Sequence, residues 1–188
     1  MTTSIITIEE RSEAVFNKQD IRDIPVTGRR VIVRVDFNVP THPESNKISD
    51  DARIKAAMPT IDYLVKKNAK VIICTHLGRP DGKVVEELRL NRVADKLKQF
   101  TSARSEYIPD SIGSLVQNKI SLLKDGEILL LENLRFHPQE ELSDEKFSSE
   151  LASMADIFVN DAFSVSHRAH ASTVGIPRFL PSVAGLLM

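Results

Sequence analysis

The sequence predicts an α/β fold, a three-layer α/β/α Rossmann-like domain with a mainly parallel sheet of about six strands. After residue 30, short apolar runs alternate with longer amphipathic stretches, which is the order expected of repeated β-α-β units. The chain has 188 residues, which fits one domain, and a domain of this size buries roughly 70% of its unfolded surface. The core therefore needs neither disulfides nor a metal to hold it together.

The first strand is predicted by an alternating pattern between residues 31 and 40. One face carries Val31, Val33, Val35, Phe37 and Val39. The other face carries Ile32, Arg34, Asp36 and Asn38. Alternation with a period of two, rich in β-branched residues, is typical of a strand, here Val31–Phe37. A strand face becomes charged where it leaves the core and enters a cleft, so this strand is expected to deliver polar groups to a site.

Later apolar runs predict the other strands. We expect them at Val71–Thr75, Glu106–Ile108, Glu127–Leu131, Ile157–Asn160 and near Ala184–Met188. The single cysteine, Cys74, lies in the first of these runs and is expected to be a buried apolar side chain rather than a catalytic thiol. One cysteine excludes an internal disulfide and is typical of a reducing compartment.

Helices are predicted between the strands. The first follows the capping residues Ser49–Asp51, and Pro59 is expected to kink it or to divide it in two. Its apolar stripe is Ile54, Ala57, Met58, Ile61 and Leu64. Further helices are predicted at Leu90–Phe100, from Ser111 to about Ile120, and from Ser143 onward, where Phe147, Leu151 and Met154 share a face. We interpret these stripes as core-facing.

Composition excludes several classes of partner. The formal net charge is −1 and the pI is near 6.5, so neither nucleic acid nor a membrane surface is expected as a partner. No apolar run approaches the ~20 residues that span a bilayer, and the N-terminus lacks a secretory layout, so we expect a cytoplasmic protein. Residues 1–24 show weak patterning and are expected to form an extension or peripheral segment before a domain at 25–188.

Basic and polar residues follow the predicted strands at their carboxyl ends. Asp36 and Asn38 follow the first strand, and other groups follow at 76–80, 133–137 and 160–170. Ligands of parallel α/β sheets bind at this edge, so these side chains are expected to share one rim. The expected rim carries His76, Arg79, Arg135, His167, Arg168 and His170, with Arg53 reaching it from the first helix. Converging arginines suit a small ligand with two anionic groups, and Asp36 and Asn38 suit a hydroxyl.

Other sites are weaker matches to the sequence. His167 and His170 form half of a metal site at most, so no metal is expected. The segment Gly78–Val84 is one residue short of a phosphate loop, and the chain offers no cradle for a nucleotide. A strand ending in Asp36-Phe37-Asn38 also resembles the nucleophile strand of haloacid-dehalogenase-type phosphatases, but Asn38 stands in place of their second acid.

Five motifs together resemble the phosphoglycerate kinase family. They are RVDFNVP at 34–40, HLGRP at 76–80, LENLRFH at 131–137, VNDAF at 159–163 and HRAHAS at 167–172, the last followed by Val174-Gly175. They occur in the order and with the spacing of the family, from about residue 25 to the end. One departure is Ser164–Ser166, where many members have Gly-Thr-Ala.

The resemblance implies the N-terminal, 3-phosphoglycerate-binding domain of a two-domain enzyme. It implies the substrate-binding residues Asp36, Phe37, Asn38, Arg53, His76, Leu77, Gly78, Arg79, Arg135 and Arg168. Within this set, Asp36 and Asn38 hold the region of the C2 hydroxyl, and Arg53 faces the transferred phosphoryl group as the catalytic residue. Arg34 would orient a supporting basic patch, in which His167 and His170 add positive potential.

The reaction implied by the resemblance is reversible phosphoryl transfer from MgATP to the carboxylate of 3-phosphoglycerate, giving 1,3-bisphosphoglycerate and MgADP. A carboxylate is already ionised at neutral pH, so positioning and charge neutralisation suffice and no general base is required. The nucleotide would bind to the enzyme's own C-terminal domain, which we expect to be absent from this chain. The chain is then expected to be a monomer that binds substrate without turnover. A free-standing module that binds a phosphorylated acid is the alternative.

Overall fold

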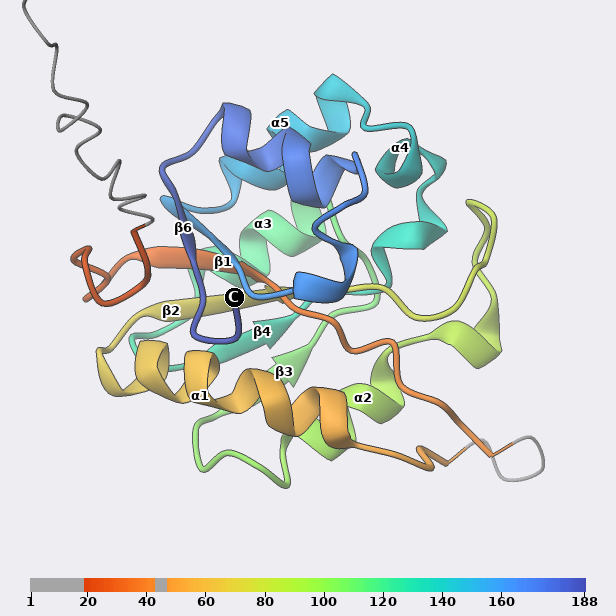
Figure 1. The fold of residues 1–188 in the computed structure, drawn as a ribbon, viewed down its shortest axis with the longest axis horizontal. Helices are drawn as coiled ribbons and strands as arrows, with labels where there is room; N and C mark the ends of the chain where they lie inside the picture. Colours follow the sequence, from red (N-terminus) through yellow and green to blue (C-terminus); the bar gives the residue numbers. More distant parts are fainter. Residues whose placement is uncertain (1–18, 43–46) are drawn as a thin grey trace, which may run out of the picture.

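The protein is a three-layer α/β/α domain built on one parallel sheet, as predicted (Figure 1). The computed structural model describes residues 19–42 and 47–188. Within this part the sheet has six strands in the order β3-β4-β2-β1-β5-β6, and every pair is parallel. The strands are β1 (Arg30–Arg34), β2 (Lys70–Cys74), β3 (Ser105–Tyr107), β4 (Ile128–Leu130), β5 (Ile157–Asn160) and β6 (Ser182–Ala184). Residues 1–18 of the predicted N-terminal segment lie outside the described residues.

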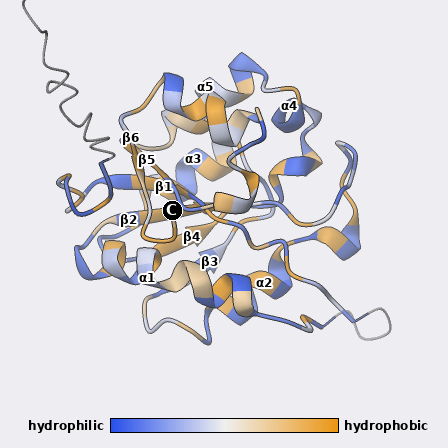
Figure 2. Ribbon diagram, in the orientation of Figure 1, coloured by the Kyte–Doolittle hydropathy of each residue, from blue (hydrophilic) through white to orange (hydrophobic). Residues whose placement is uncertain are grey.

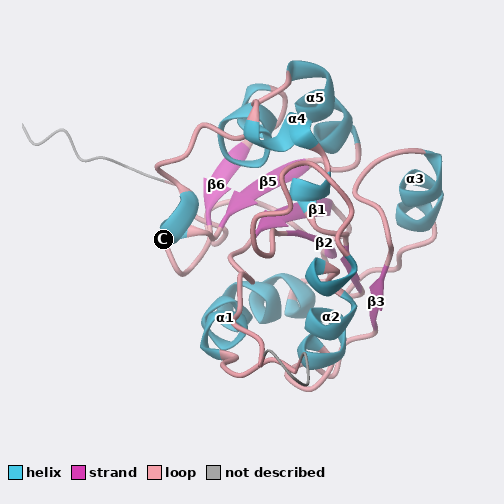
Figure 3. Ribbon diagram, turned by 90° about the vertical axis from the view of Figure 1, so that its right-hand side faces the viewer, coloured by secondary structure: helices cyan, strands magenta, loops and turns pink. Residues whose placement is uncertain are grey.

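Helices cover both faces of the sheet. They are α1 (Ala52–Lys66), α2 (Asn91–Leu97), α3 (Ser114–Ser121), α4 (Pro138–Glu141) and α5 (Glu145–Ser153). The view turned by 90° shows α1 and α2 on one side of the sheet, with α4 and α5 on the other (Figure 3). The buried side chains form two clusters that match this arrangement, one with α1 and α2 and one with α3 and α5. Figure 2 shows the apolar strands enclosed between the two helical layers.

The alternating pattern of β1 divides its side chains between the two clusters as predicted. Val31, Val33 and Val35 pack with α1 and α2, whereas Ile32 packs with α3 and α5. The hydrogen-bonded strand ends at Arg34, earlier than the predicted Phe37. The amide of Phe37 donates to the side-chain oxygen of Thr75 at 2.9 Å, so a side chain replaces the backbone ladder there.

Pro59 lies inside α1, which continues unbroken from Ala52 to Lys66, so the predicted division of this helix is wrong. Proline cannot donate to the carbonyl group of Lys55, four residues earlier. Both Lys55 and Pro59 are exposed, so water can satisfy this carbonyl group. The unbroken helix carries Arg53 in its first turn, close to the end of β1.

The last strand, β6, lies earlier in the sequence than predicted. After it, backbone amides bond to side chains instead of to a neighbouring strand. The amide of Gly185 donates to the carbonyl oxygen of Asn160, but the amides of Leu186 and Leu187 donate to the side chains of Thr60 and Asp161. These side chains end the strand because they take the donors that a sheet would use. No described helix is long and apolar enough to cross a membrane.

Residues Gln19 to Ile21 lie along the outer side of β6. The amide of Ala184 donates to the carbonyl oxygen of Gln19, and the amide of Ile21 donates back to that of Ala184, both at 3.0 Å. Ile21 is fully buried in the cluster that contains α1 and α2. The domain boundary expected at residue 25 stays a prediction, although this earlier segment already contributes to the core.

Candidate anion-binding site

A polar cavity of about 270 Å³ lies at the carboxyl ends of the central strands. Its lining residues are Asp36, Asn38, Arg53, His76, Gly78, Arg79, Arg135, Ser164, Val165 and Arg168. They come from the segments after β1, β2, β4 and β5 and from the first turn of α1. The topology explains this convergence, because parallel strands end at the same edge of the sheet.

Positive charge dominates the cavity. Arg53, Arg79, Arg135 and Arg168 all line it, and Asp36 is the one carboxylate among the lining residues. A guanidinium group offers several N–H donors in a planar fork and keeps its charge at neutral pH. The arrangement therefore suits a small ligand with more than one anionic group, as the sequence predicts.

Asp36 holds two groups at one side of the cavity. Its Oδ2 accepts hydrogen bonds from Arg53 Nη1 and from Ser164 Oγ. The Arg53 side chain is 48% exposed, whereas that of Asp36 is 8% exposed. These contacts leave Asp36 engaged with a cation and a hydroxyl group, which does not favour the phosphatase alternative, in which this residue would be a free nucleophile.

Asn38 positions the loop after β2. Its Oδ1 accepts a hydrogen bond from the amide of Gly78 at 2.8 Å, and the carbonyl group of Gly78 accepts one from Arg135 Nη1 at 2.8 Å. Gly78 has a φ of 65°, and a Cβ at this position would lie 2.7 Å from Leu88 Cδ2. A glycine is thus required both by the backbone conformation and by the close approach of Leu88.

Arg135 is nearly buried, with 5% of its side chain exposed. Burial lowers the pKa of this guanidinium, while Glu141, whose Oε1 lies 3.1 Å from Arg135 Nε, opposes the shift. Arg34 and Arg168 act in the same direction as burial. Three arginines close together make this part of the cavity attractive to an anion that would neutralise them.

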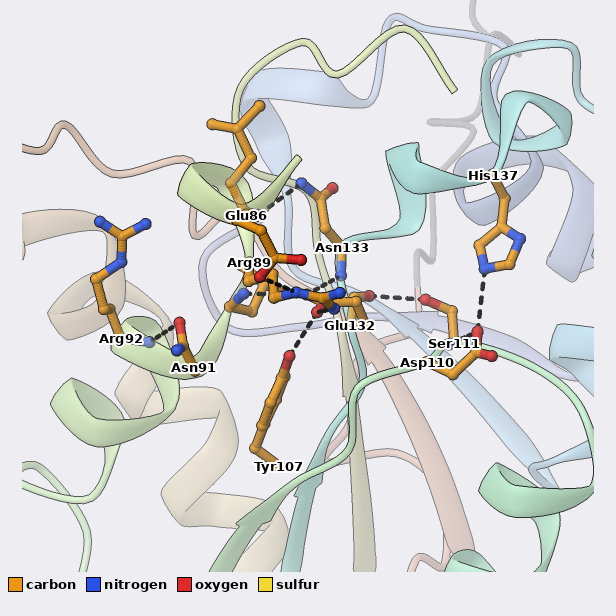
Figure 4. Close-up of polar contacts among 12 residues, drawn as sticks. Glu86, Arg89, Asn91, Arg92, Tyr107, Asp110, Ser111, Glu132, Asn133 and His137 are labelled. Carbon is orange, nitrogen blue, oxygen red and sulfur yellow. Dashed lines mark hydrogen bonds and ion pairs between the residues drawn. The ribbon is translucent and has the colours of Figure 1, made fainter. Parts of the chain in front are cut away.

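A buried polar network around Asn133 and Glu132, part of which is drawn in Figure 4, holds the backbone of Arg135 and of the loop after β2. Asn133 Nδ2 donates to the carbonyl oxygens of Leu77 and Leu88, and Asn133 Oδ1 accepts from the amides of Leu77 and Arg135. All the hydrogen-bonding capacity of this fully buried amide is used. The result is a rigid connection between the ends of β2 and β4.

Glu132 completes this network. Its carboxylate accepts hydrogen bonds from Arg89 Nη1, the amides of Leu90 and Asn133, and the Tyr107 hydroxyl. Burial, followed by the hydrogen bond to Glu132, raises the pKa of Tyr107. The Arg89 charge pairs with a nearly buried carboxylate here, so it supports the loop and does not add to the charge of the cavity.

Some predicted site residues do not line the cavity. Phe37 and Leu77 point into the cluster packed on α1 and α2, and Arg34 is buried on the other side of the sheet with 1% exposed. The expectation that the polar face of β1 enters a cleft is therefore wrong at Arg34. α4 and the turn Ala171–Gly175 supply Glu140 and Ser172, which lie near this arginine, so it remains inside the protein.

The two histidines of the last motif also lie outside the lining. His167 is exposed, and His170 is largely buried, with Nδ1 3.9 Å from Glu140 Oε1. Burial lowers the pKa of His170, and Arg135 and Arg168 lower it further, against the opposing effect of Glu140. The lowered pKa disfavours the charged form of His170, and the expectation that this residue adds positive potential stays a prediction.

Ser164 and Val165 line the cavity but were not predicted as site residues. They lie between Asn160 and His167, in the segment 164–166 that departs from the common family pattern. The sequence feature that indicates them is their position after a predicted strand, between two segments that are predicted to reach the rim. Ser164 lies at the cavity because its hydroxyl group donates to Asp36.

The described residues give no indication of a metal or nucleotide site. No group of three or more His, Cys, Asp or Glu side chains that could hold a metal ion occurs within 19–42 and 47–188. Cys74 is buried as predicted, and burial raises the pKa of its thiol to about 12. This thiol is therefore not a nucleophile at neutral pH.

Comparisons with known proteins agree on one family. The family model described as "Phosphoglycerate kinase" matches residues 21–188. The phosphoglycerate kinase of Pelotomaculum thermopropionicum is 50% identical over 171 residues, which are 91% of this chain and 43% of that protein. The phosphoglycerate kinase of Herpetosiphon aurantiacus is 52% identical over 173 residues, which are 92% of this chain and 44% of that protein.

Solved structures give the same result. The crystal structure of phosphoglycerate kinase from Pyrococcus horikoshii OT3 matches with a TM-score of 0.82 and 37% identity, over 90% of this chain and 42% of that one. The structure of phosphoglycerate kinase from Coxiella burnetii matches with a TM-score of 0.79 and 32% identity over the same shares. The chain spans less than half the length of these relatives.

Proposed function

The chain belongs to the phosphoglycerate kinase family, and from this we propose that its cavity binds 3-phosphoglycerate for reversible phosphoryl transfer from ATP. The convergence of Arg53, Arg79, Arg135 and Arg168 from separate elements on one cavity is the observation that carries this proposal. 3-Phosphoglycerate has a phosphate group at one end, a carboxylate at the other and a hydroxyl group between them. Several guanidinium groups match the first two, because each can bind oxyanions with paired donors.

Asp36 and Asn38 support the same assignment on the other side of the cavity. Both carry side-chain oxygens that accept a hydrogen bond from a hydroxyl group, and Asn38 also has an amide donor. We place the C2 hydroxyl group of the substrate beside them. The phosphate end then lies near His76, Arg79, Arg135 and Arg168, which the resemblance to the family also implies.

The proposed chemistry needs charge neutralisation more than acid–base catalysis. The carboxylate oxygen of the substrate attacks the γ-phosphorus of ATP, the bond to ADP breaks, and an acyl phosphate forms. Since the attacking group is already ionised, no proton has to be removed. Arg53 is half-exposed at the edge of the cavity, so we assign it the transferred phosphoryl group and the main catalytic role.

The nucleotide is assigned elsewhere in this proposal. The described residues contain no cluster of side chains suited to a metal ion, and their cavity is lined mainly by anion-binding groups. MgATP would bind to the part of a full-length relative that this chain does not span. Within the same proposal the enzyme is monomeric, and it is cytoplasmic, a location that agrees with a single reduced thiol.

Calorimetric titration of this chain with 3-phosphoglycerate tests the proposal. We expect weak binding that falls as salt is added, and that Arg168→Ala or Arg79→Ala reduces at least tenfold. The matched control is Arg29→Ala, because Arg29 is exposed just before the amino end of β1, at the edge of the sheet opposite to the cavity. No heat of binding at low salt, or equal losses in Arg79→Ala and Arg29→Ala, would contradict the proposal.

A further inference from the structure

His76 lines the cavity, and its imidazole ring also contacts a buried cation. Its ring lines the cavity although only 3% of the residue is exposed. Nδ1 of the ring lies 3.0 Å from Arg34 Nη2, on the inner side. Within residues 19–42 and 47–188, no group forms a hydrogen bond with Nε2, on the other side of the ring.

Arg34 is held rigidly in its position. Its Nε donates to Ser172 Oγ at 2.8 Å, and its Nη1 donates to the carbonyl oxygen of Val35. Ser172 in turn donates from Oγ to Glu140 Oε1 at 2.5 Å and from its amide to Glu140 Oε2 at 3.0 Å. Arg34 and Glu140 are 1% and 0% exposed. The guanidinium group cannot turn away from His76 without breaking buried hydrogen bonds, which is costly.

The chemistry of the two groups decides where the proton of the ring lies. A guanidinium group has only donors, so the nitrogen facing it must accept. Nδ1 of His76 therefore carries no proton, and the single proton of the neutral ring lies on Nε2. A doubly protonated ring would place an N–H and a positive charge against those of Arg34.

We propose that Arg34 is a positioning residue that fixes His76 as a neutral Nε2–H donor, so that His76 offers an uncharged hydrogen bond to an oxygen of the anionic ligand. This inference deepens the proposed function, on which the identity of the ligand depends. In this arrangement the arginines supply the positive charge of the cavity, and the hydrogen bond from His76 orients the ligand. Anion binding then does not depend on titration of His76 near neutral pH.

The charged groups around the ring support a neutral His76. The pKa of His76 is lowered to about 2, with burial as the largest cause and Arg34 as the next, and Arg135, His170 and Arg168 act in the same direction. These groups come from β1, from the segment after β4 and from the segment after β5, so they surround the ring from different elements. Glu140 contacts Ser172 and lies 3.9 Å from His170 Nδ1.

The tautomer of His76 can be measured without any ligand. We would record two-bond ¹H–¹⁵N correlations of the imidazole rings on the ¹⁵N-labelled chain, from about pH 8 to about pH 5, and assign them with His76→Gln. The expected spectrum has a protonated Nε2 and an unprotonated Nδ1 at every pH. A proton on Nδ1, or a ring that titrates near the ordinary value of ~6.5, would overturn the inference. Because no ligand is present, this outcome is separate from failure of the proposed function.

The role of Arg34 is tested by replacing it together with Glu140, to which it is linked through Ser172. Arg34→Met combined with Glu140→Gln avoids leaving a buried carboxylate unpaired. We expect the ring of His76 to become a mixture of tautomers and its pKa to rise, although burial still holds the pKa below the ordinary value. A ring that keeps its Nε2 proton and its pKa in this folded variant would contradict a positioning role for Arg34.

Two substitutions of His76 supply a test that does not disturb Arg34. The amide nitrogen of glutamine can occupy the place of Nε2, whereas that of asparagine reaches only the place of Nδ1. With 3-phosphoglycerate as the probe, His76→Gln should bind within about threefold of the original chain, and His76→Asn should lose about tenfold or more. Equal losses of affinity in the two variants would contradict a directed Nε2–H donor. This test of the proposal remains available if the double variant does not fold.

Discussion

Arg135 Nη1 donates a hydrogen bond to the carbonyl oxygen of Gly78 at 2.8 Å. Arg135, in the segment after β4, therefore holds the loop after β2 in place, and Arg135 and Gly78 both line the cavity. Asn133 reinforces this connection, since its side chain bonds the amide of Arg135 and both backbone groups of Leu77. A side chain proposed to bind the ligand thus also shapes the loop that binds it.

Arg135→Lys should weaken binding of 3-phosphoglycerate about tenfold or more. Lysine is a point charge without the planar fork, so it cannot donate to Gly78 and pair with an oxyanion in the same way. Calorimetry would give the affinity, and urea unfolding would show a loss of about 1 kcal/mol from the missing hydrogen bond. Arg29→Lys serves as the control, and unchanged affinity in Arg135→Lys would contradict a direct role for this residue.

Arg53→Ala should affect binding less than it affects turnover. The Arg53 side chain is half-exposed and already paired with Asp36, so its charge is partly neutralised before the ligand arrives. Binding is measured on this chain and turnover on a full-length relative with the same substitution. A residue that acts only in the transition state lowers kcat while leaving KM nearly unchanged. Losses of equal size in binding and turnover would remove the special role of Arg53.

Gly78→Ala should destabilise the protein more than Gly113→Ala. Both glycines have a positive φ, 65° and 91°, so alanine is strained at either position. At Gly78 the new Cβ also meets Leu88 Cδ2 at 2.7 Å, whereas at Gly113 nothing lies within 4 Å. We expect a loss of about 1 kcal/mol in the free energy of unfolding for Gly113→Ala and about 2–3 kcal/mol for Gly78→Ala. Thermal or urea unfolding measures both, and equal losses would show that Leu88 moves aside freely.

Glu132→Gln should be more destabilising than Tyr107→Phe. The carboxylate accepts from four donors, so an amide group would turn its own N–H donors toward some of them. Tyr107→Phe removes only one of these donors and should cost about 1 kcal/mol, against about 3 kcal/mol or more for Glu132→Gln. Chemical unfolding measures the difference. A smaller loss for Glu132→Gln than for Tyr107→Phe would mean that the buried carboxylate is not needed.

Asp161 should make the stability of the protein depend on pH between about 4 and 6. Burial raises the pKa of this carboxyl group from 3.8 to about 6, although hydrogen bonds from the Leu187 amide and Thr60 oppose the shift. A raised pKa means that the folded protein holds the proton more tightly than the unfolded chain. The contribution of Asp161 is therefore fully present below pH ~4 and is lost as the pH rises through ~6, by up to about 3 kcal/mol.

Asp161→Asn isolates this contribution. The amide group has no charge to desolvate, so the variant should gain stability relative to the original chain as the pH rises from 4 to 7. Unfolding curves at several pH values would show the two proteins diverging over this range. Stability profiles that stay parallel from pH 4 to 7 would mean that Asp161 is not a source of the pH dependence.

The sequence by itself determined the class of fold and most of the cavity. Alternation in β1 and the order of apolar runs reflect local geometry, because a strand exposes its faces with a fixed period of two. A second rule, that parallel strands end at the same edge of a sheet, placed Asp36, Asn38, His76, Arg79 and Arg135 at that edge, where the structure brings them together.

Only the tertiary structure decided which of the polar residues turn inward. Period and spacing show the face on which Arg34 lies, but they do not show that Ser172, 138 residues away along the chain, covers that face. The same holds for His170, which is largely buried beside Glu140. Burial depends on which distant elements pack together, and it is burial that turned Arg34 from a ligand-facing residue into one that holds His76.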